Sequence, residues 1–388
     1  MALIDPTLHI EVQLTSSIPQ ATQQAIRAEV AKWVDQMYKS VEIGSRLEYN
    51  KRLKHEKMIG RVQVVDFTGP PQASTWVEVE GVKLDVQTYH LRQPTETGNR
   101  RFVEQDDHTS QARSLALPNA LLNDEWDSLV FDDALPARLL RYLVRMAAMM
   151  SQPDLNLATF NWNRLCLLHG PPGSGKSTLC RALAQKMAIR LGEKFAAADL
   201  VEINANAMLS KYFGESGKLI ESTFDRVMER AKDGKKLVIV VIDEVETIAG
   251  SRKMASGGGE CHDGLRDPAF LDRVDIKQYI PSPSTSAIYN IFRFCLNELI
   301  RSKLITADDD VPTLATTHMT LHDSLESAGF RLSKVAEKCA KFAVSGRTLR
   351  RLPVLGLATY TWGAAQTLDN AVAALEKAVE QEVLSRAE

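Results

Sequence analysis

Residues 165–178 read Leu165-Cys166-Leu167-Leu168-His169-Gly170-Pro171-Pro172-Gly173-Ser174-Gly175-Lys176-Ser177-Thr178. They comprise a short apolar strand, the pattern G-x-x-x-x-G-K-S, and the start of an apolar-periodic segment that continues through Leu179, Leu183 and Met187. A strand before the glycines and a helix after them is the context that a phosphate-binding loop requires. A chance glycine turn would not explain why both flanks are correct. We therefore expect a nucleotide-phosphate site here.

Each part of this loop has a chemical role toward a nucleotide. The glycines permit backbone conformations and a close phosphate approach that a Cβ would obstruct. Backbone N–H groups and the positive end of the following helix point at the β-phosphate. Lys176 supplies a positive charge to the β- and γ-phosphates, and the Ser177 hydroxyl supplies a ligand to Mg²⁺. The predicted cofactors are ATP and Mg²⁺, and the predicted nucleotide-binding residues are Gly170, Pro171, Pro172, Gly173, Ser174, Gly175, Lys176, Ser177 and Thr178.

A second motif closes an apolar run at residues 236–244, where six apolar residues are followed by Asp243 and Glu244. A continuous apolar run is typical of a parallel strand covered by helices on both faces. Ligands lie at the C-terminal ends of such strands. Asp243 is therefore predicted to hold Mg²⁺, directly or through water, and Glu244 to take a proton from the attacking water. Charges at a strand end can be purely structural, but two adjacent carboxylates downstream of a phosphate loop favour the catalytic interpretation.

The composition is that of an ordinary soluble globular protein, with 44% apolar and 25% charged residues. A chain of 388 residues is long enough for two or three domains. The formal net charge of −2 gives no support for non-specific nucleic-acid binding, although a local basic patch is not excluded. No apolar run approaches the roughly 20 residues that span a bilayer, and residues 1–13 lack the features of a signal peptide. We expect neither a membrane nor nucleic acid as a direct partner.

The five cysteines, Cys166, Cys180, Cys261, Cys295 and Cys339, are scattered and contain no C-x-x-C pair. Such usage indicates reduced, mostly packed thiols in the cytosol or nucleus. Cys261-His262 lies beside a glycine run, but no second pair completes a metal site. We interpret that segment as a loop.

Periodicity predicts a small α+β domain over residues 1–92. Alternating apolar residues from Leu8 to Leu14 indicate a half-buried strand, and a helix is expected from about Pro19. Residues 59–67, 76–79 and 82–89 have the composition of strands, the last two joined by a turn at Glu80-Gly81. Residues 93–125 are polar and are interpreted as a linker whose charges are solvated.

The remaining chain alternates strands and helices before it becomes helical. The nucleotide domain is predicted over 126–280, with a helix at 136–150, a strand at 200–204 and a helix at 220–231. A helical lid is predicted over 281–388 because apolar residues between 288 and 300 follow helical spacing for four turns. Further helices are expected near 331–343, 347–360 and 368–386. The fold class is therefore α/β.

Together these motifs resemble the AAA+ ATPases, and within them the family of pachytene checkpoint protein 2, also called thyroid-receptor-interacting protein 13. The matching segments span about 126 to 353, and the N-terminal third carries less of the resemblance. They are Trp126–Asp132, Trp162-Asn163-Arg164 leading into Leu168-His169-Gly170-Pro171-Pro172-Gly173, Ser210–Leu219, Ile242–Glu246, Phe270–Ile280 and Ser345–Pro353.

The resemblance implies a parallel sheet flanked by helices, a helical lid and an N-terminal domain that binds substrate or an adaptor. It also implies a homo-hexameric ring that hydrolyses ATP to convert HORMA-domain proteins from closed to open forms. Such rings act in meiotic chromosome-axis and recombination-checkpoint control and in spindle-checkpoint control. The expected localisation is the nucleus, on chromosomes, with the cytoplasm as a second compartment.

The resemblance also assigns residues. Lys211, Tyr212, Phe213 and Gly214 match the pore loop that grips a threaded segment; an aromatic beside a glycine turn is a large apolar contact with few rotatable bonds. Core packing of Tyr212 is the alternative, which its polar, glycine-rich neighbours disfavour. Arg347 matches the lid arginine that reaches the γ-phosphate in the same subunit. Arg273 is our choice for the arginine that acts across the subunit interface, although a surface salt bridge explains it equally well.

The sequence departs from the family between Gly250 and Asp267. The family has a helix and a central strand there, and that strand ends in a polar residue, usually Asn, that orients the attacking water. A helix of about 11 residues, a strand of about 5 and their loops need on the order of 25 to 30 residues, so residues 251–266 cannot contain them. Without that strand, the phosphate-loop strand and the Asp243 strand would lie about 9.6 Å apart. Either the chain is a shortened form, or its sheet pairs differently.

Three functional interpretations follow. The first is a remodelling ATPase whose activity is impaired in this short form. The second is an ATP-binding interaction subunit that does not turn over, and the third is a clamp-loader-like ATPase acting on DNA. The near-neutral charge and the aromatic pore segment argue against the third.

Overall fold

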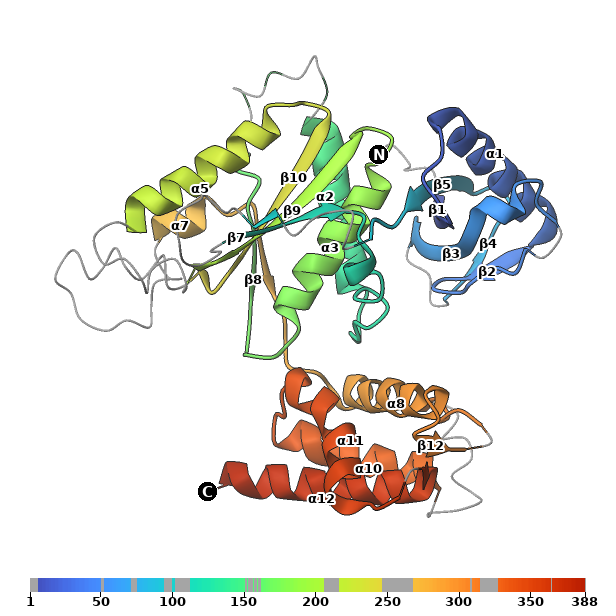
Figure 1. Ribbon diagram of the computed structural model, residues 1–388, viewed down its shortest axis with the longest axis vertical. Coiled ribbons are helices and arrows are strands. Elements are labelled where there is room, and N and C mark those ends of the chain that lie inside the picture. Colours follow the sequence, from blue (N-terminus) through green and yellow to red (C-terminus); the bar gives the residue numbers. More distant parts are fainter. Residues whose placement is uncertain are drawn as a thin grey trace. The chain divides into compact units, whose positions relative to one another are not determined.

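The computed structural model describes residues 6–49, 52–70, 75–93, 100–101, 112–150, 152, 156, 159, 162–205, 216–245, 268–307, 309–314, 327–363 and 365–387 (Figure 1). The chain divides into two compact units. The first comprises Met1–Trp126, Pro136–Trp162 and Cys180–Arg273, and the second comprises Asp127–Leu135, Asn163–Leu179 and Val274–Glu388. Within the described ranges, no helix combines the length and the apolar character that crossing a membrane requires.

The N-terminal part of the first unit is the expected small α+β fold. Strand β1 (Thr7–Leu14) lies between β3 (Ile59–Thr68), which is antiparallel to it, and β5 (Lys83–His90), which is parallel. The alternation read from the sequence has a direct structural cause: Leu8, Ile10, Val12 and Leu14 are buried in one core with apolar residues of α1 (Gln20–Met37). A short antiparallel pair, β2 (Ser40–Glu42) and β4 (Trp76–Glu78), and a 3₁₀ turn, η1 (Glu56–Met58), complete this part.

The structure corrects the linker that we expected over residues 93–125. Residues Ala112–Leu117 form β7, which pairs antiparallel with β9 (Ala197–Asn204). Strand β6 (Arg100–Arg101) pairs with β7, and η2 (Ala120–Leu122) follows it. This segment forms a strand because Leu115 and Leu117, two residues apart, point to the same face and are buried against α3 (Lys176–Arg190). The domain boundaries themselves stay predictions.

The first unit contains a four-stranded sheet in the order β10-β9-β7-β6, where β10 is Lys236–Asp243 and runs parallel to β9. Helix α3 covers one face and α5 (Ser216–Ala231) covers the other, and α2 (Leu135–Met150) lies on the α3 side (Figure 1). Alternate residues of β10 face the two helices: Leu237, Ile239 and Val241 pack toward α3, and Val238, Val240 and Ile242 toward α5. This double coverage explains the continuous apolar run and confirms the α/β class.

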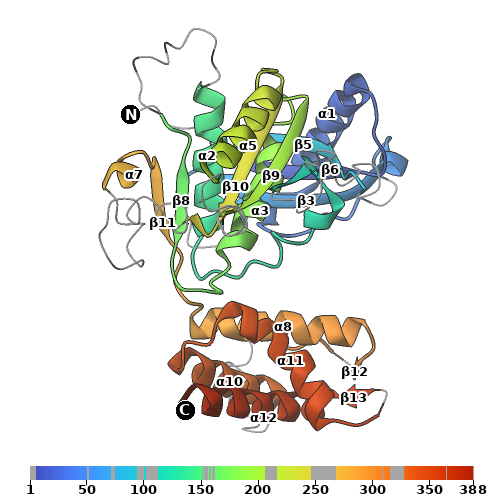
Figure 2. The same ribbon diagram turned by 60° about the vertical axis from the view of Figure 1, so that its left-hand side comes forward.

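The phosphate-loop strand belongs to a separate sheet. Strand β8 (Cys166–His169) pairs in parallel with β11 (Ile276–Tyr279), which lies beside it in Figure 2. No ladder among the described strands joins β8 to β10. The absence of a central strand stays a prediction, and direct pairing of β8 with β10 is not observed in the described residues. The short segment itself, residues 251–266, lies outside them; helix α7 (Pro268–Asp272), which follows it, is described.

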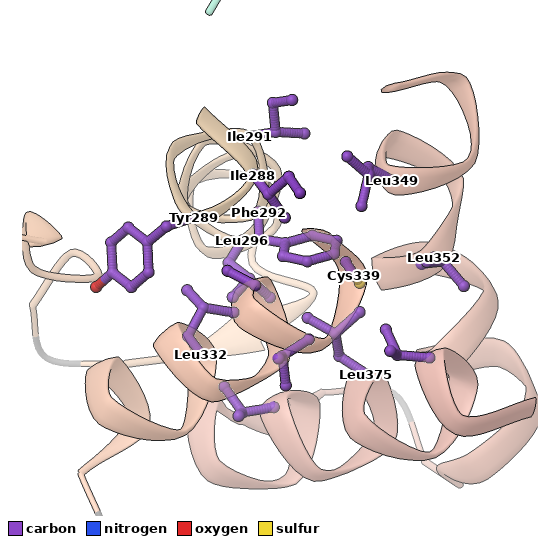
Figure 3. Packing of buried hydrophobic residues seen from close by; sticks show 14 of the residues in the cluster. Ile288, Tyr289, Ile291, Phe292, Leu296, Leu332, Cys339, Leu349, Leu352 and Leu375 are labelled. Atoms are coloured by element: carbon purple, nitrogen blue, oxygen red, sulfur yellow. The ribbon is translucent and has the colours of Figure 1, made fainter. Parts of the chain in front are cut away.

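The second unit ends in the predicted helical lid. Its helices are α8 (Thr285–Arg301), α10 (Ala328–Lys341), α11 (Gly346–Tyr360) and α12 (Leu368–Ala387), with a short parallel pair, β12 (Ile305–Thr306) and β13 (Gln366–Thr367). Side chains from all four helices converge around Phe292 (Figure 3). Serines begin three of these helices by accepting a backbone N–H bond, as good N-caps do: Ser284, Ser327 and Ser345.

Candidate functional site

The phosphate loop joins β8 to α3 and has the backbone that its glycines permit. Gly170 and Gly173 have φ values of 146° and 71°, in the region that side chains disfavour. A Cβ on Gly170 would also lie 2.1 Å from the carbonyl oxygen of Ile280, the residue after β11, so the backbone there packs directly against the loop. Glycine is therefore required here both for conformation and for space.

The polar groups of the loop fit a phosphate. Lys176 Nζ donates to the carbonyl oxygens of Gly170 at 2.9 Å and Pro171 at 2.7 Å, which holds the ammonium over the loop. Ser174 Oγ is buried and has no hydrogen-bond partner. A buried hydroxyl without a partner carries a desolvation cost that a bound phosphate oxygen would remove. Ser177 and Thr178 lie in the first turn of α3; their roles toward Mg²⁺ and nucleotide stay predictions.

Asp275 fixes the strand that leads into the loop, and sequence reasoning did not assign it a role. Its carboxylate accepts the backbone N–H of Leu165 at 2.8 Å and of Asn163 at 3.2 Å. Burial, together with the charge of Asp275, raises the pKa of Cys166 to about 11, so Cys166 stays a neutral thiol at neutral pH. Asp275 belongs to the segment Phe270–Ile280, which the sequence analysis singled out. Its hydrogen-bond partners, Asn163 and Leu165, lie far away in the sequence.

The lid meets the phosphate loop at the first residues of α11. A Cβ built on Gly173 would lie 2.8 Å from Ser345 Cβ and 3.7 Å from Arg347 Cβ. A Cβ on Gly346 would lie 2.8 Å from the Gly173 carbonyl oxygen. The structure therefore brings Arg347 to the loop, with its side chain exposed to solvent. Sequence reasoning singled out Arg347 but missed Ser345 and Gly346 as the residues that form the contact.

The predicted catalytic carboxylates lie at the C-terminal end of β10, in the first unit, and both are exposed. Asp243 Oδ1 accepts the backbone N–H of Glu244 at 3.1 Å. Glu244 has a φ of 58°, which is uncommon for a residue other than glycine and costs on the order of 1–3 kcal/mol. Backbone strain of this kind is concentrated at functional sites.

Arg181 on α3 is a second residue that sequence reasoning missed. Its Nε donates to Glu202 on β9 at 2.5 Å, and its Nη1 lies 3.8 Å from Glu125. The hydrogen bond to Glu202 raises the pKa of Arg181, and the charge of Asp243 adds to the effect. Arg181 therefore connects the helix that follows the phosphate loop with the two neighbouring strands that carry Glu202 and Asp243.

Of the remaining predicted site residues, Arg273 is described and the pore-loop residues are not. Arg273 is exposed directly after α7, and its backbone N–H bonds to the Phe270 carbonyl at 3.1 Å. Lys211, Tyr212, Phe213 and Gly214 lie outside the described residues, as do Cys261 and His262. Across the described ranges, no group of three or more His, Cys, Asp or Glu side chains is arranged to hold a metal ion.

Three family profiles match successive parts of the chain. The profile of the TRIP13 N-terminal domain matches residues 3–94. The profile of the ATPase family associated with various cellular activities (AAA) matches residues 166–267, and that of the TRIP13-like AAA+ ATPase lid C-terminal domain matches residues 284–383.

Similar proteins cover nearly the whole chain. Pachytene checkpoint protein 2 homologs of Danio rerio and Homo sapiens are 31% and 30% identical over 414 and 417 aligned positions, covering 98% of this chain and 95% and 94% of theirs. The solved structure of C. elegans PCH-2 shares the fold, with a TM-score of 0.75 and 24% identity over 98% of this chain and 99% of that one. Both alignments are longer than the 388 residues present here, so those relatives carry residues for which this chain has no counterpart.

Proposed function

Because the chain belongs to the pachytene checkpoint protein 2 family of AAA+ ATPases, we propose that it binds ATP at residues 170–178 and uses ATP hydrolysis to remodel HORMA-domain proteins from closed to open forms. The observation that carries the ATP site is the packing of Gly173 against Ser345 and Gly346, which holds Arg347 beside the phosphate loop.

Binding would use groups that the loop already presents. Charged phosphate oxygens accept stronger hydrogen bonds from an ammonium group than neutral carbonyl oxygens do. Lys176 would therefore leave the carbonyl oxygens of Gly170 and Pro171 and donate to the β- and γ-phosphates instead. The Ser174 hydroxyl would gain a partner in the same step. Ser177 and Asp243 would hold Mg²⁺, which when bound supplies positive charge to the phosphates.

Hydrolysis would use side chains outside the loop. Glu244, whose backbone is in the left-handed region, would accept a proton from the attacking water. Arg347 would stabilise negative charge on the terminal phosphate in the same subunit, and Arg273 would do so across a subunit interface. Asp243 is the last residue of β10 and Glu244 follows it; among the described strands, β10 has β9 alone as its partner. We propose that having one neighbouring strand in the described sheet leaves these carboxylates less firmly held and slows hydrolysis.

The partners follow from family membership and are part of the proposal. Residues 1–92 would bind the HORMA-domain substrate or an adaptor, which is supported by the match of the TRIP13 N-terminal profile to residues 3–94. Six copies would form a ring in which residues 211–214 grip the threaded substrate. The proposed location is the nucleus, on chromosomes engaged in meiotic and checkpoint control, with the cytoplasm as a second compartment.

One alternative function is an ATP-binding subunit that does not turn over, and it is favoured by the single neighbour, β9, that β10 has among the described strands. The two activities are separated by measuring ATP affinity by titration and phosphate release on the same preparation, with a closed HORMA-domain protein present or absent. The main proposal expects ATP binding, slow phosphate release and accumulation of the open form on ion-exchange chromatography. Tight ATP binding without phosphate release or conversion would favour the alternative, and absence of ATP binding would refute both.

A further inference from the structure

We infer that Gly346 is a positioning residue: its missing side chain lets α11 lie directly on the phosphate loop and thereby holds Arg347 at the terminal phosphate of the nucleotide. The inference rests on the proposed ATP binding and concerns how the lid arginine is placed.

The contact that carries this inference is between two backbones. A Cβ on Gly346 would lie 2.8 Å from the Gly173 carbonyl oxygen. In the reverse direction, a Cβ on Gly173 would lie 2.8 Å from Ser345 Cβ and 2.9 Å from Ser345 Oγ. Backbone atoms cannot rotate aside as the end of a flexible side chain can. Any side chain at Gly346 must therefore move either the loop or the start of α11.

The helix itself gives no reason for a glycine at this position. Gly346 is the first residue of α11 and follows Ser345, whose hydroxyl accepts the Thr348 N–H at 3.3 Å. Its φ is not among the positive values of the described glycines. Alanine is favoured over glycine within helices by up to about 1 kcal/mol. Helix stability alone would thus favour alanine, and the contact with Gly173 is the feature that opposes it.

The consequence falls on the next residue. Arg347 Cβ lies 3.7 Å from the Cβ position of Gly173, and the Arg347 side chain extends from this anchored point into solvent. A displacement of about 1 Å at a group that positions a reacting phosphate can cost about 10²-fold in rate. The Gly346→Ala substitution should therefore act like loss of Arg347, while the lid remains folded.

Two other glycines provide matched controls. Gly234 has no atom within 4 Å of its Cβ position, so Gly234→Ala should leave the protein unchanged. Gly356 lies in the same helix as Gly346, but its Cβ would meet the Ala374 carbonyl oxygen of α12 at 2.8 Å. Gly356→Ala therefore disturbs packing inside the lid without touching the phosphate loop.

The experiment compares the parent chain with Gly346→Ala, Arg347→Met, the double variant and the two controls. ATP and ADP affinities are measured by titration with fluorescent analogues, together with the melting temperature and phosphate release. We expect the parent to prefer ATP over ADP, both single variants to lose that preference to the same extent, and the double variant to lose no more. The melting temperature of Gly346→Ala should equal that of the parent, whereas that of Gly356→Ala should be lower.

Retention of the ATP preference in Gly346→Ala, or additive losses in the double variant, would overturn the inference. A melting temperature lowered as in Gly356→Ala would also overturn it, because Gly346 would then serve lid folding. A parent chain that binds ATP but releases no phosphate would refute the proposed hydrolysis, and the affinity ratios would still decide the role of Gly346. A parent that binds neither nucleotide would refute the proposed function itself.

Discussion

Strands β9 and β10 run side by side in parallel, yet their side chains differ in burial. Val201 on β9 is 0% exposed, whereas its register partner Val240 on β10 is only partly buried. Both strands are covered by helices on both faces. The difference in burial comes from the neighbouring strands within the sheet. Strand β9 lies between β10 and β7, whereas β10 has no second neighbour among the described strands. An apolar sequence therefore predicts a strand, but its burial depends on neighbours that lie elsewhere in the chain.

A similar contrast separates two groups of predicted site residues, which lie in different units. The phosphate loop is supported by Ile280 behind it and by Ser345 and Gly346 beside it. Asp243 and Glu244 instead lie, both exposed, at the C-terminal end of β10, which has β9 as its one neighbour among the described strands. We therefore expect nucleotide binding to be robust and hydrolysis to be the sensitive step.

The largest effect is expected at the catalytic half of the site. Glu244→Gln keeps the size of the side chain but removes the base, and loss of a general base typically costs about 10²–10⁴-fold in rate. Phosphate release should fall by that amount, while ATP affinity from titration stays at the parent value. Glu229→Gln, an exposed change on α5, is the control. Phosphate release within about twofold of the parent would reject the role of Glu244.

A smaller but still large effect is expected at the binding half. Lys176→Ala removes the ammonium that lies over the loop. Hydrogen bonds to charged groups contribute about 1.5–3 kcal/mol, so ATP affinity should fall about 10- to 100-fold. Titration with a fluorescent ATP analogue measures the change, and exposed Lys232→Ala serves as the control. An unchanged dissociation constant would contradict the phosphate-loop assignment.

The smallest effects test the two strands themselves. Val201→Ala and Val240→Ala remove the same atoms at partner positions that both face α5. Val201→Ala should lower the free energy of unfolding by about 2 kcal/mol, and Val240→Ala by about half of that or less. Urea denaturation of both variants measures the difference. Equal losses would mean that β10 is as enclosed as β9, and the contrast between the strands would disappear.

Local patterns predicted much of the fold. The period-two alternation of Leu8 to Leu14 and the helical spacing of Ile288 to Ile300 each depend on neighbouring residues, and both elements are present in the structure. The phosphate loop was equally predictable, because its glycines, lysine and flanks are consecutive. Its position between β8 and α3 agrees with the sequence.

Contacts between distant segments could not be predicted in this way. Strand β7 was missed because only Leu115 and Leu117 are apolar and buried within a polar surrounding sequence. The support of Leu165 by Asp275 and the contact of Gly173 with Gly346 join segments that only the folded chain brings together. The absence of a central strand over residues 251–266 stays a prediction from segment length, because the number of residues limits which elements can fit.

The most direct test of the account is the phosphate-release rate of two chains measured side by side. One is the chain with its present sequence, and the other carries a helix and an apolar strand ending in Asn, inserted between Gly264 and Asp267. We expect faster phosphate release from the longer chain, together with a higher melting temperature, because each buried backbone group left unpaired costs about 1–3 kcal/mol. Equal rates and equal melting temperatures in the two chains would contradict it and show that the additional strand is not needed.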